Sequence, residues 1–157
     1  MILHREVAAM ELTGSIRPIL ERKGGLVCSV SPSDSVYKAI EMMAEKQVGA
    51  LIVLFEDKIV GIISERDYAR KVILKGYFSR ELTVAEIMSS PVITVTPNHT
   101  LAQCMQIITD HRIRHLPVLE GDRLVGVISI GDLVNAILTE QSETIRHLEA
   151  YISGRPG

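Results

Sequence analysis

The sequence predicts an α/β fold made of two copies of one strand–helix–strand–strand–helix unit. The segment Gly61–Asp67, which reads GIISERD, has a counterpart 65 residues later in Gly126–Asp132, which reads GVISIGD. A repeat of this length indicates an internal duplication. With 157 residues, the chain is long enough for the two halves to share one compact core. The same offset aligns six further pairs of identical residues without a gap: Pro32 with Pro97, Leu51 with Leu116, Val53 with Val118, Leu54 with Leu119, Asp57 with Asp122, and Val60 with Val125.

The first repeat follows from its apolar spacing and its turn residues. A lead segment over residues 15–20 combines a hydroxyl cap with a short amphipathic turn, and Pro18 fits only the first turn of a helix. Val36, Ala39 and Met43 recur at helical spacing behind a turn and a helix cap. Two apolar runs joined by a tight turn predict an antiparallel hairpin. The predicted elements are a strand over 26–30, a helix over 36–45, strands over 50–55 and 59–64, and a helix over 67–74 that Gly76 ends.

The second repeat has the same order of elements. Its lead segment, residues 83–88, resembles residues 15–20 at a spacing that is three residues longer than the repeat. Ile145, Leu148 and Ile152 lie at i, i+3 and i+7, so a further amphipathic helix is predicted beyond Thr139. This helix has no counterpart in the repeat, and a dimer contact is a reasonable use for it. The predicted elements are a strand over 92–95, a helix over 101–111, strands over 115–119 and 124–129, and a helix over 132–138.

We therefore expect an N-terminal arm over residues 1–14, a first motif over 15–78, a second over 79–140, and a C-terminal helix and tail over 141–157. With 17 basic and 19 acidic residues, the net charge of -2 gives no general attraction to nucleic acid or to anionic membranes. No apolar run approaches the roughly 20 residues that span a bilayer, and the first residues lack a signal-peptide pattern, so a cytoplasmic location is expected. Cys28 and Cys104 are interpreted as structural thiols.

Each copy of the repeated motif reads as a buried strand that ends on a hydroxyl, then a short turn, then an aspartate at the opening of a helix. Such an arrangement is a place to hold a polar ligand. The Gly-x-x-Ser-x-x-Asp pattern, found twice in one register, resembles the cystathionine-β-synthase (CBS) domain pair, or Bateman module. The resemblance covers about residues 15–140. It implies a tandem pair with pseudo-two-fold symmetry that regulates other proteins.

The resemblance also implies the ligand class, an adenosine-containing molecule bound between the motifs. AMP, ADP, ATP and NAD(H) are expected ahead of S-adenosylmethionine. The carboxylates of Asp67 and Asp132 suit the two donors of a ribose diol. Ser64 and Ser129 lie one turn earlier, where hydroxyls and helix-start amides can meet ribose or phosphate oxygens. Arg66 suits a phosphate, and the second motif has glycine at this position, so the first cleft is expected to bind phosphate more strongly.

In the family, each cleft is completed from the other repeat. The residues expected to join Asp67 are Val92, Arg114 and His115. The residues expected to join Asp132 are Val27, Gly49 and Ala50. The basic cluster of Arg112, Arg114 and His115 again favours the Asp67 cleft for a charged ligand.

Structural alternatives exist for most of these residues. The two aspartates and the two serines are also good helix caps. Arg66 can equally be a solvated charge, His115 a half-buried strand residue, and the charged run Glu21–Lys23 a solvated face. The scattered histidines show no metal-ligand spacing, and no phosphate-binding loop or nucleophile elbow is present. The sequence thus favours a non-catalytic nucleotide sensor that forms a homodimer and acts on a separate effector protein, with a ligand-free homodimeric assembly protein as the alternative.

Overall fold

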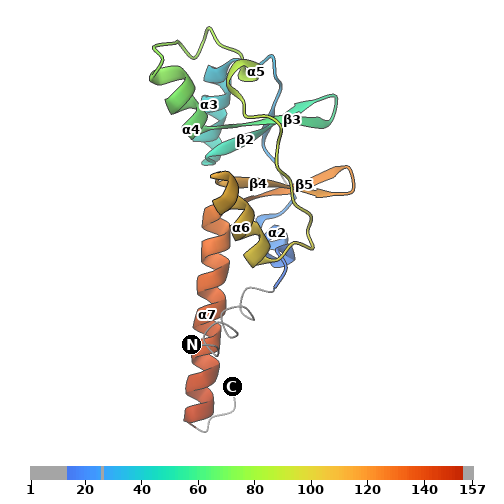
Figure 1. Ribbon diagram of the computed structural model, residues 1–157, viewed down its shortest axis with the longest axis vertical. Helices are drawn as coiled ribbons and strands as arrows, with labels where there is room; N and C mark the ends of the chain where they lie inside the picture. The colour runs from blue at the N-terminus through green and yellow to red at the C-terminus, as the bar shows by residue number, and fades with distance from the viewer. Residues whose placement is uncertain (1–13, 26, 154–157) are drawn as a thin grey trace. The chain divides into compact units, whose positions relative to one another are not determined.

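The computed structural model describes residues 14–25 and 27–153, and these divide into two compact units (Figure 1). The first unit holds residues 27–93, and the second joins residues 14–25 to residues 94–153. Apart from Gly14, the expected N-terminal arm lies outside the described residues, as do Leu26 and the tail from residue 154. The two compact units do not coincide with the two repeats, and the expected motif boundaries at 15–78 and 79–140 stay a prediction.

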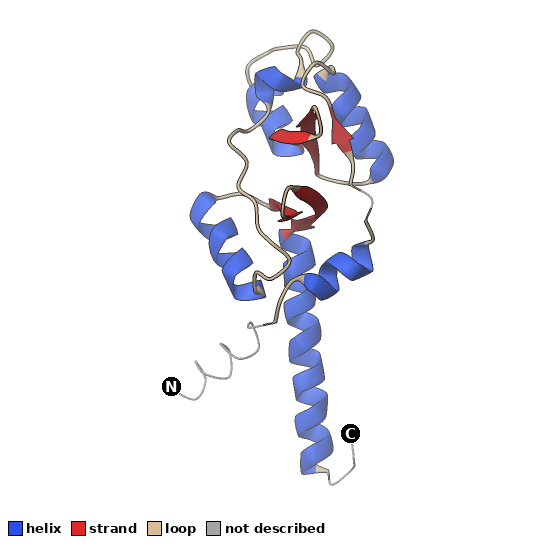
Figure 2. Ribbon diagram, turned by 90° about the vertical axis from the view of Figure 1, so that its right-hand side faces the viewer, coloured by secondary structure: helices blue, strands red, loops and turns tan. Residues whose placement is uncertain are grey.

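The first unit is a small sheet packed with helices (Figure 2). Its strand order is β1-β2-β3, in which β1 is parallel and β3 antiparallel to the central strand β2. The strands are β1 (Ser29–Val30), β2 (Ala50–Phe55) and β3 (Lys58–Ser64). The helices are α3 (Val36–Lys46), α4 (Glu65–Tyr68), the π-helix η1 (Ala69–Ile73) and α5 (Val84–Ile87).

The second unit repeats the hairpin and its helices. Strands β4 (His115–Glu120) and β5 (Arg123–Ser129) pair antiparallel. The helices are α2 (Arg17–Lys23), α6 (Leu101–His111) and α7 (Ile130–Ile152). Each hairpin has a register shift at the same place, between Val53 and Leu54 in β2 and between Val118 and Leu119 in β4.

Equivalent positions form the two cores. In the first unit Leu51 and Ile63 of the hairpin are at most 1% exposed and lie in one cluster with Val36, Ala39 and Met43 of α3. The corresponding buried residues of the second unit are Leu116, Ile128, Leu101, Cys104 and Ile108. Burying an aliphatic side chain of this size stabilises the fold by about 1.5–3 kcal/mol. The apolar spacing that predicted helices and hairpins therefore also identifies both cores.

Each lead segment packs on the hairpin of the other repeat. In the first unit the segment that ends at Met88 lies against β3, where Ile62 exchanges backbone hydrogen bonds of 3.1 and 2.8 Å with Ser89. In the second unit α2 packs on β5, with Leu20 over Gly126. Glycine at positions 61 and 126 permits this approach, because a Cβ at either position would collide with the lead segment. The sequence did not predict this packing, because it joins segments that are far apart along the chain.

Several predicted boundaries are confirmed by the structure. The helices expected over 36–45 and 101–111 are found at Val36–Lys46 and Leu101–His111. Both begin at hydroxyl caps, where Ser35 accepts from the Lys38 amide and Thr100 from the Gln103 amide. The predicted hairpin strands are also present within one residue of their expected ends.

The prediction of first strands over 26–30 and 92–95 was largely wrong. Only Ser29 and Val30 pair in the first unit, and in the second unit the strand is reduced to one bridge between Val95 and Val118. The difference has a physical reason. The amide of Ile52 donates to Cys28 at 3.3 Å, whereas the equivalent of Ile52 in the second repeat is proline, which has no N–H to donate.

The predicted helices that follow each motif also need correction. The helix expected over 67–74 starts at Glu65, because Ser64 is its cap, and continues as the π-helix Ala69–Ile73. The two helices expected over 132–138 and beyond Thr139 are one continuous helix, α7. No glycine or proline interrupts the stretch after Gly131, so nothing in it stops the helix.

Candidate functional site

The first copy of the motif is a capping box that joins β3 to α4. The Ser64 Oγ accepts a hydrogen bond of 3.1 Å from the Asp67 amide. The Asp67 Oδ2 in turn accepts 3.1 Å hydrogen bonds from the Ser64 amide and from the Ser64 hydroxyl. Asp67 is therefore the third residue of the helix rather than its cap, and Ser64 is the cap.

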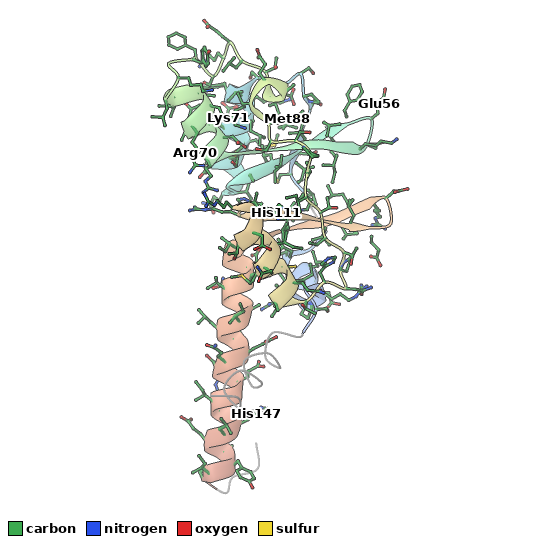
Figure 3. The ribbon with its side chains drawn as sticks, in the orientation of Figure 1. Glu56, Arg70, Lys71, Met88, His111 and His147 are labelled. Carbon is green, nitrogen blue, oxygen red and sulfur yellow. The ribbon has the colours of Figure 1, made fainter. Side chains whose placement is uncertain are left out.

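The second oxygen of Asp67 is also in use. Its Oδ1 lies 3.0 Å from the Nζ of Lys71 and accepts a 3.1 Å hydrogen bond from the Ser89 hydroxyl. Lys71, labelled in Figure 3, also donates to the carbonyl of Ile87 at 2.9 Å. A carboxylate has about four acceptor positions, and four donors of the first unit reach this one. The Asp67 side chain is 12% exposed.

The second copy of the motif forms the same box with different surroundings. Asp132 Oδ2 accepts from the Ser129 amide at 2.8 Å, and the Ser129 Oγ accepts from the Asp132 amide at 3.1 Å. The other partner is Lys23 of α2, whose Nζ lies 2.6 Å from the same Oδ2 and donates to the carbonyl of Val127 at 2.8 Å. Asp132 is 23% exposed, about twice as much as Asp67.

The electrostatics of the second motif are governed by Lys23. Burial acts to raise the pKa of Asp132, but the hydrogen bond from Lys23 and those from Ser129 outweigh it and hold the pKa below its usual value. His115 lies opposite Ser129 in the hairpin. Burial, together with the charges of Lys23 and Arg114, lowers the pKa of His115 against the opposing effect of Asp132. The imidazole is therefore neutral near pH 7, and the ammonium of Lys23 supplies the positive charge beside the carboxylate.

The predicted site residues fall in both units. Val27, Gly49, Ala50, Ser64, Arg66, Asp67 and Val92 belong to the first unit, and Arg114, His115, Ser129 and Asp132 belong to the second. Within each unit, the residue before the hairpin supports the motif that follows it. The Gly49 carbonyl accepts from the Glu65 amide at 3.1 Å, and the Arg114 carbonyl accepts from the Ile130 amide at 2.9 Å. Completion of each cleft from the other repeat stays a prediction.

Sequence reasoning missed three polar partners of the motif, namely Lys23, Lys71 and Ser89. Lys71 had a signal, because a lysine four residues after an aspartate lies on the same helix face. Lys23 was expected on a solvated face, and its side chain is 41% exposed, yet its ammonium binds Asp132. No sequence signal could reveal Lys23 or Ser89, since each follows a lead segment that packs on the other repeat's hairpin.

Three further features of the described residues concern metal ligands, membrane-spanning helices and the buried cysteine. In residues 14–25 and 27–153, no group of three or more His, Cys, Asp or Glu side chains is placed to hold a metal ion. The same part of the chain contains no helix that is both long and apolar enough to cross a membrane. Cys104 is fully buried, and burial raises the pKa of its thiol to about 11, which fits the structural role expected for it.

Comparison with known proteins now gives the family. The sequence pattern of the CBS domain matches residues 13–74 and 84–139. The chain belongs to the CBS-domain family. The CBS pair is 39% identical to the mitochondrial CBS domain-containing protein CBSX3 of Arabidopsis thaliana, over 94% of this chain and 78% of that protein. A solved CBS-domain protein from Burkholderia ambifaria MC40-6 is 46% identical, with a TM-score of 0.79, over 82% of this chain and 96% of that one.

The CBS pair also matches part of an enzyme. It is 31% identical to inosine-5'-monophosphate dehydrogenase of Korarchaeum cryptofilum, but 84% of this chain covers only 27% of that protein. The match to CBSX3, in contrast, covers 78% of that protein. CBS pairs are regulatory modules that often bind adenosine-containing ligands.

Proposed function

We propose that this CBS pair is a non-catalytic sensor that binds an adenine nucleotide and passes the signal to a separate effector protein. One observation carries the proposal: the repeated Ser–Asp capping box holds a carboxylate at the end of a strand, beside a lysine, in a chain of this family. The ligand is held at one or both of these carboxylates. Its binding shifts the population of module conformations, and the altered surface acts on the effector.

The charges around the two motifs support a phosphorylated ligand. Each aspartate is paired with a lysine, so neither motif presents an uncompensated negative charge to an incoming phosphate. Further positive charge comes from Arg66, within the first motif, and from Arg114, directly before strand β4 of the second unit. S-adenosylmethionine carries a sulfonium cation, which these lysines disfavour. AMP, ADP, ATP and NAD(H) are therefore the ligands we expect.

We further propose that the module works as a homodimer. Helix α7 exposes Ile145, Leu148 and Ile152 at helical spacing. These side chains form an apolar face that a second copy can cover. The expected cytoplasmic location stays a prediction, and the CBSX3 relative is mitochondrial by name.

The proposal is tested by calorimetric titration of the full chain against AMP, ADP, ATP, NAD, NADH and S-adenosylmethionine. We expect saturable binding of at least one nucleotide, and loss of that binding in the double variant Asp67→Asn/Asp132→Asn. Lys38→Met removes another lysine–aspartate pair, to Asp34, and is the matched control that should bind normally. A ligand at 100 times its dissociation constant also adds about 2.7 kcal/mol to stability, which a melting curve detects.

No binding of any nucleotide by folded protein free of carried-over ligand would refute the sensor. The assembly function would then stand alone. It predicts that Leu148→Glu, which places a charge on the apolar face of α7, converts the oligomer to a monomer in analytical ultracentrifugation.

A further inference from the structure

We propose that Asp132 is the ligand-binding carboxylate of this chain and that Lys23 selects an anionic ligand there. The carboxylate of Asp67, in contrast, serves only to stabilise the fold. The inference rests on the proposed function and names which copy of the motif carries it. It follows from a difference between the residues that contact the two aspartates, which lie outside the repeated motif.

The first step is the number of acceptor positions left on each carboxylate. Asp67 receives four donors from its own unit, two on each oxygen: the Ser64 amide and hydroxyl, the Ser89 hydroxyl and the Lys71 ammonium. Asp132 receives the Ser129 amide and the Lys23 ammonium, both on Oδ2, and a side-chain hydrogen bond from Ser129 also lowers its pKa. Within the second unit, no hydrogen bond of the described residues is made to its Oδ1, which can therefore accept from the hydroxyls of a ribose.

The second step is what covers each motif. In the first unit the carbonyl of Ile62 accepts from the backbone amide of Ser89 at 2.8 Å, so the lead segment is fixed to β3 by main-chain pairing. The equivalent carbonyl in the second unit is that of Val127, and it accepts from the Lys23 ammonium at 2.8 Å. A lysine side chain on four rotatable carbons moves aside easily, whereas a paired backbone does not. Asp132 is therefore the more accessible carboxylate.

The third step is that sequence fixes this asymmetry. Leu20 and Met88 occupy equivalent places, each against the glycine of a hairpin. At that spacing Lys23 corresponds to Pro91, which has no charge. At the spacing of the repeat, Lys71 corresponds to Ala136. Each aspartate thus has its own lysine, one from the same helix and one from a lead segment.

Lys23 is the residue that makes the affinity depend on the charge of the ligand. Its ammonium neutralises Asp132 and lies partly exposed beside it, where a phosphate attached to a bound ribose would come within several ångströms. Removing the ammonium leaves the Asp132 carboxylate to repel a phosphate, and a Coulomb interaction over such a distance near a protein surface changes affinity by about fivefold or more. Neutral adenosine should not sense this change.

The experiment titrates the full chain with AMP and with adenosine in a calorimeter, using wild type, Asp132→Asn, Asp67→Asn, Lys23→Met and the control Lys38→Met. We expect Asp132→Asn to weaken both ligands by about tenfold or more, since it removes charge-assisted hydrogen bonds to the ribose. Lys23→Met should weaken AMP by about fivefold or more and adenosine by less than about twofold. Asp67→Asn should lower the melting temperature but keep AMP affinity within about threefold of wild type. Circular dichroism at the titration temperature establishes that each variant is folded.

Two results would overturn the assignment while leaving the sensor intact. One is AMP binding that survives in Asp132→Asn but is lost in folded Asp67→Asn. The other is a loss in Lys23→Met that is equal for adenosine and AMP, because Lys23 would then be holding the fold or the ribose and not reading charge. Absence of binding by the wild-type protein would overturn the proposed function and the assignment together.

Discussion

Alanine at Gly61 tests the packing of a lead segment on the other repeat's hairpin. A Cβ at this position would lie 2.9 Å from Met88 Cγ and 3.2 Å from Met88 Cβ, and it would also overlap the sulfur. Apolar carbons rest at about 3.5–4.0 Å. Because the collision reaches the Cβ of Met88, rotating the end of that side chain does not relieve it. Overpacking of this kind costs about 1–3 kcal/mol, so Gly61→Ala should lower the free energy of unfolding by that amount.

Gly126→Ala is the matched comparison in the other repeat. Its Cβ would meet only the Cδ2 methyl of Leu20, at 2.7 Å. This methyl is the far end of a flexible side chain, so the cost should stay below about 1 kcal/mol. Urea unfolding followed by circular dichroism measures both variants. Met88→Ala should cost less in the Gly61→Ala background than in the wild type, which a double-mutant cycle would show as a coupling energy of about 0.5–2 kcal/mol. Equal costs at the two glycines, or a coupling energy near zero, would refute the packing of Met88 on Gly61.

Three further predictions concern the turn, the buried histidine and the buried thiol. Glu56, at the hairpin tip in Figure 3, has φ of 51° where the other repeat has Gly121 at 62°. A positive φ is strained for glutamate but not for glycine, so Glu56→Gly should raise the free energy of unfolding by about 1 kcal/mol in urea, and Gly121→Glu should lower it. A lower free energy of unfolding in Glu56→Gly would contradict this strain. His115 has a folded-state pKa below 6.5, so the unfolded chain takes up the proton first and stability should fall as the pH drops below about 6.5. His115→Gln should remove this part of the pH dependence in melting curves. An unchanged dependence of the melting temperature on pH would contradict the prediction. Burial raises the pKa of the Cys104 thiol to about 11, so native Cys104 should not react with a thiol reagent at about pH 8, whereas the half-buried Cys28 should react. Rapid labelling of Cys104 in the folded protein would contradict its burial.

The parts of the fold that could be predicted from sequence are those set by local chemistry. Hydroxyl caps at Ser35 and Thr100 fixed the starts of α3 and α6, and apolar spacing fixed their buried faces. The hairpins followed from two apolar runs and a two-residue turn, which allows only antiparallel pairing. These signals act over a few residues, so they can be read without knowing what packs against them.

The parts that could not be predicted depend on contacts between distant segments. Lys23 reaches Asp132 only because α2 packs on β5, and Ser89 reaches Asp67 only because its backbone pairs with β3. Local pattern gave both aspartates the same role, with the first cleft favoured by the charge of Arg66. Packing instead gives the two carboxylates different numbers of protein donors, and this difference carries the assignment to Asp132.

The most direct test of the central claim is the stoichiometry of AMP binding, measured by equilibrium dialysis of the full chain at saturating AMP. If Asp132 is accessible and Asp67 is not, one AMP should bind per chain, and Asp132→Asn should bind it about tenfold or more weakly. Two AMP molecules per chain would show that the Asp67 motif also accepts ligand and would contradict the assignment, and none would contradict the nucleotide-sensing function itself.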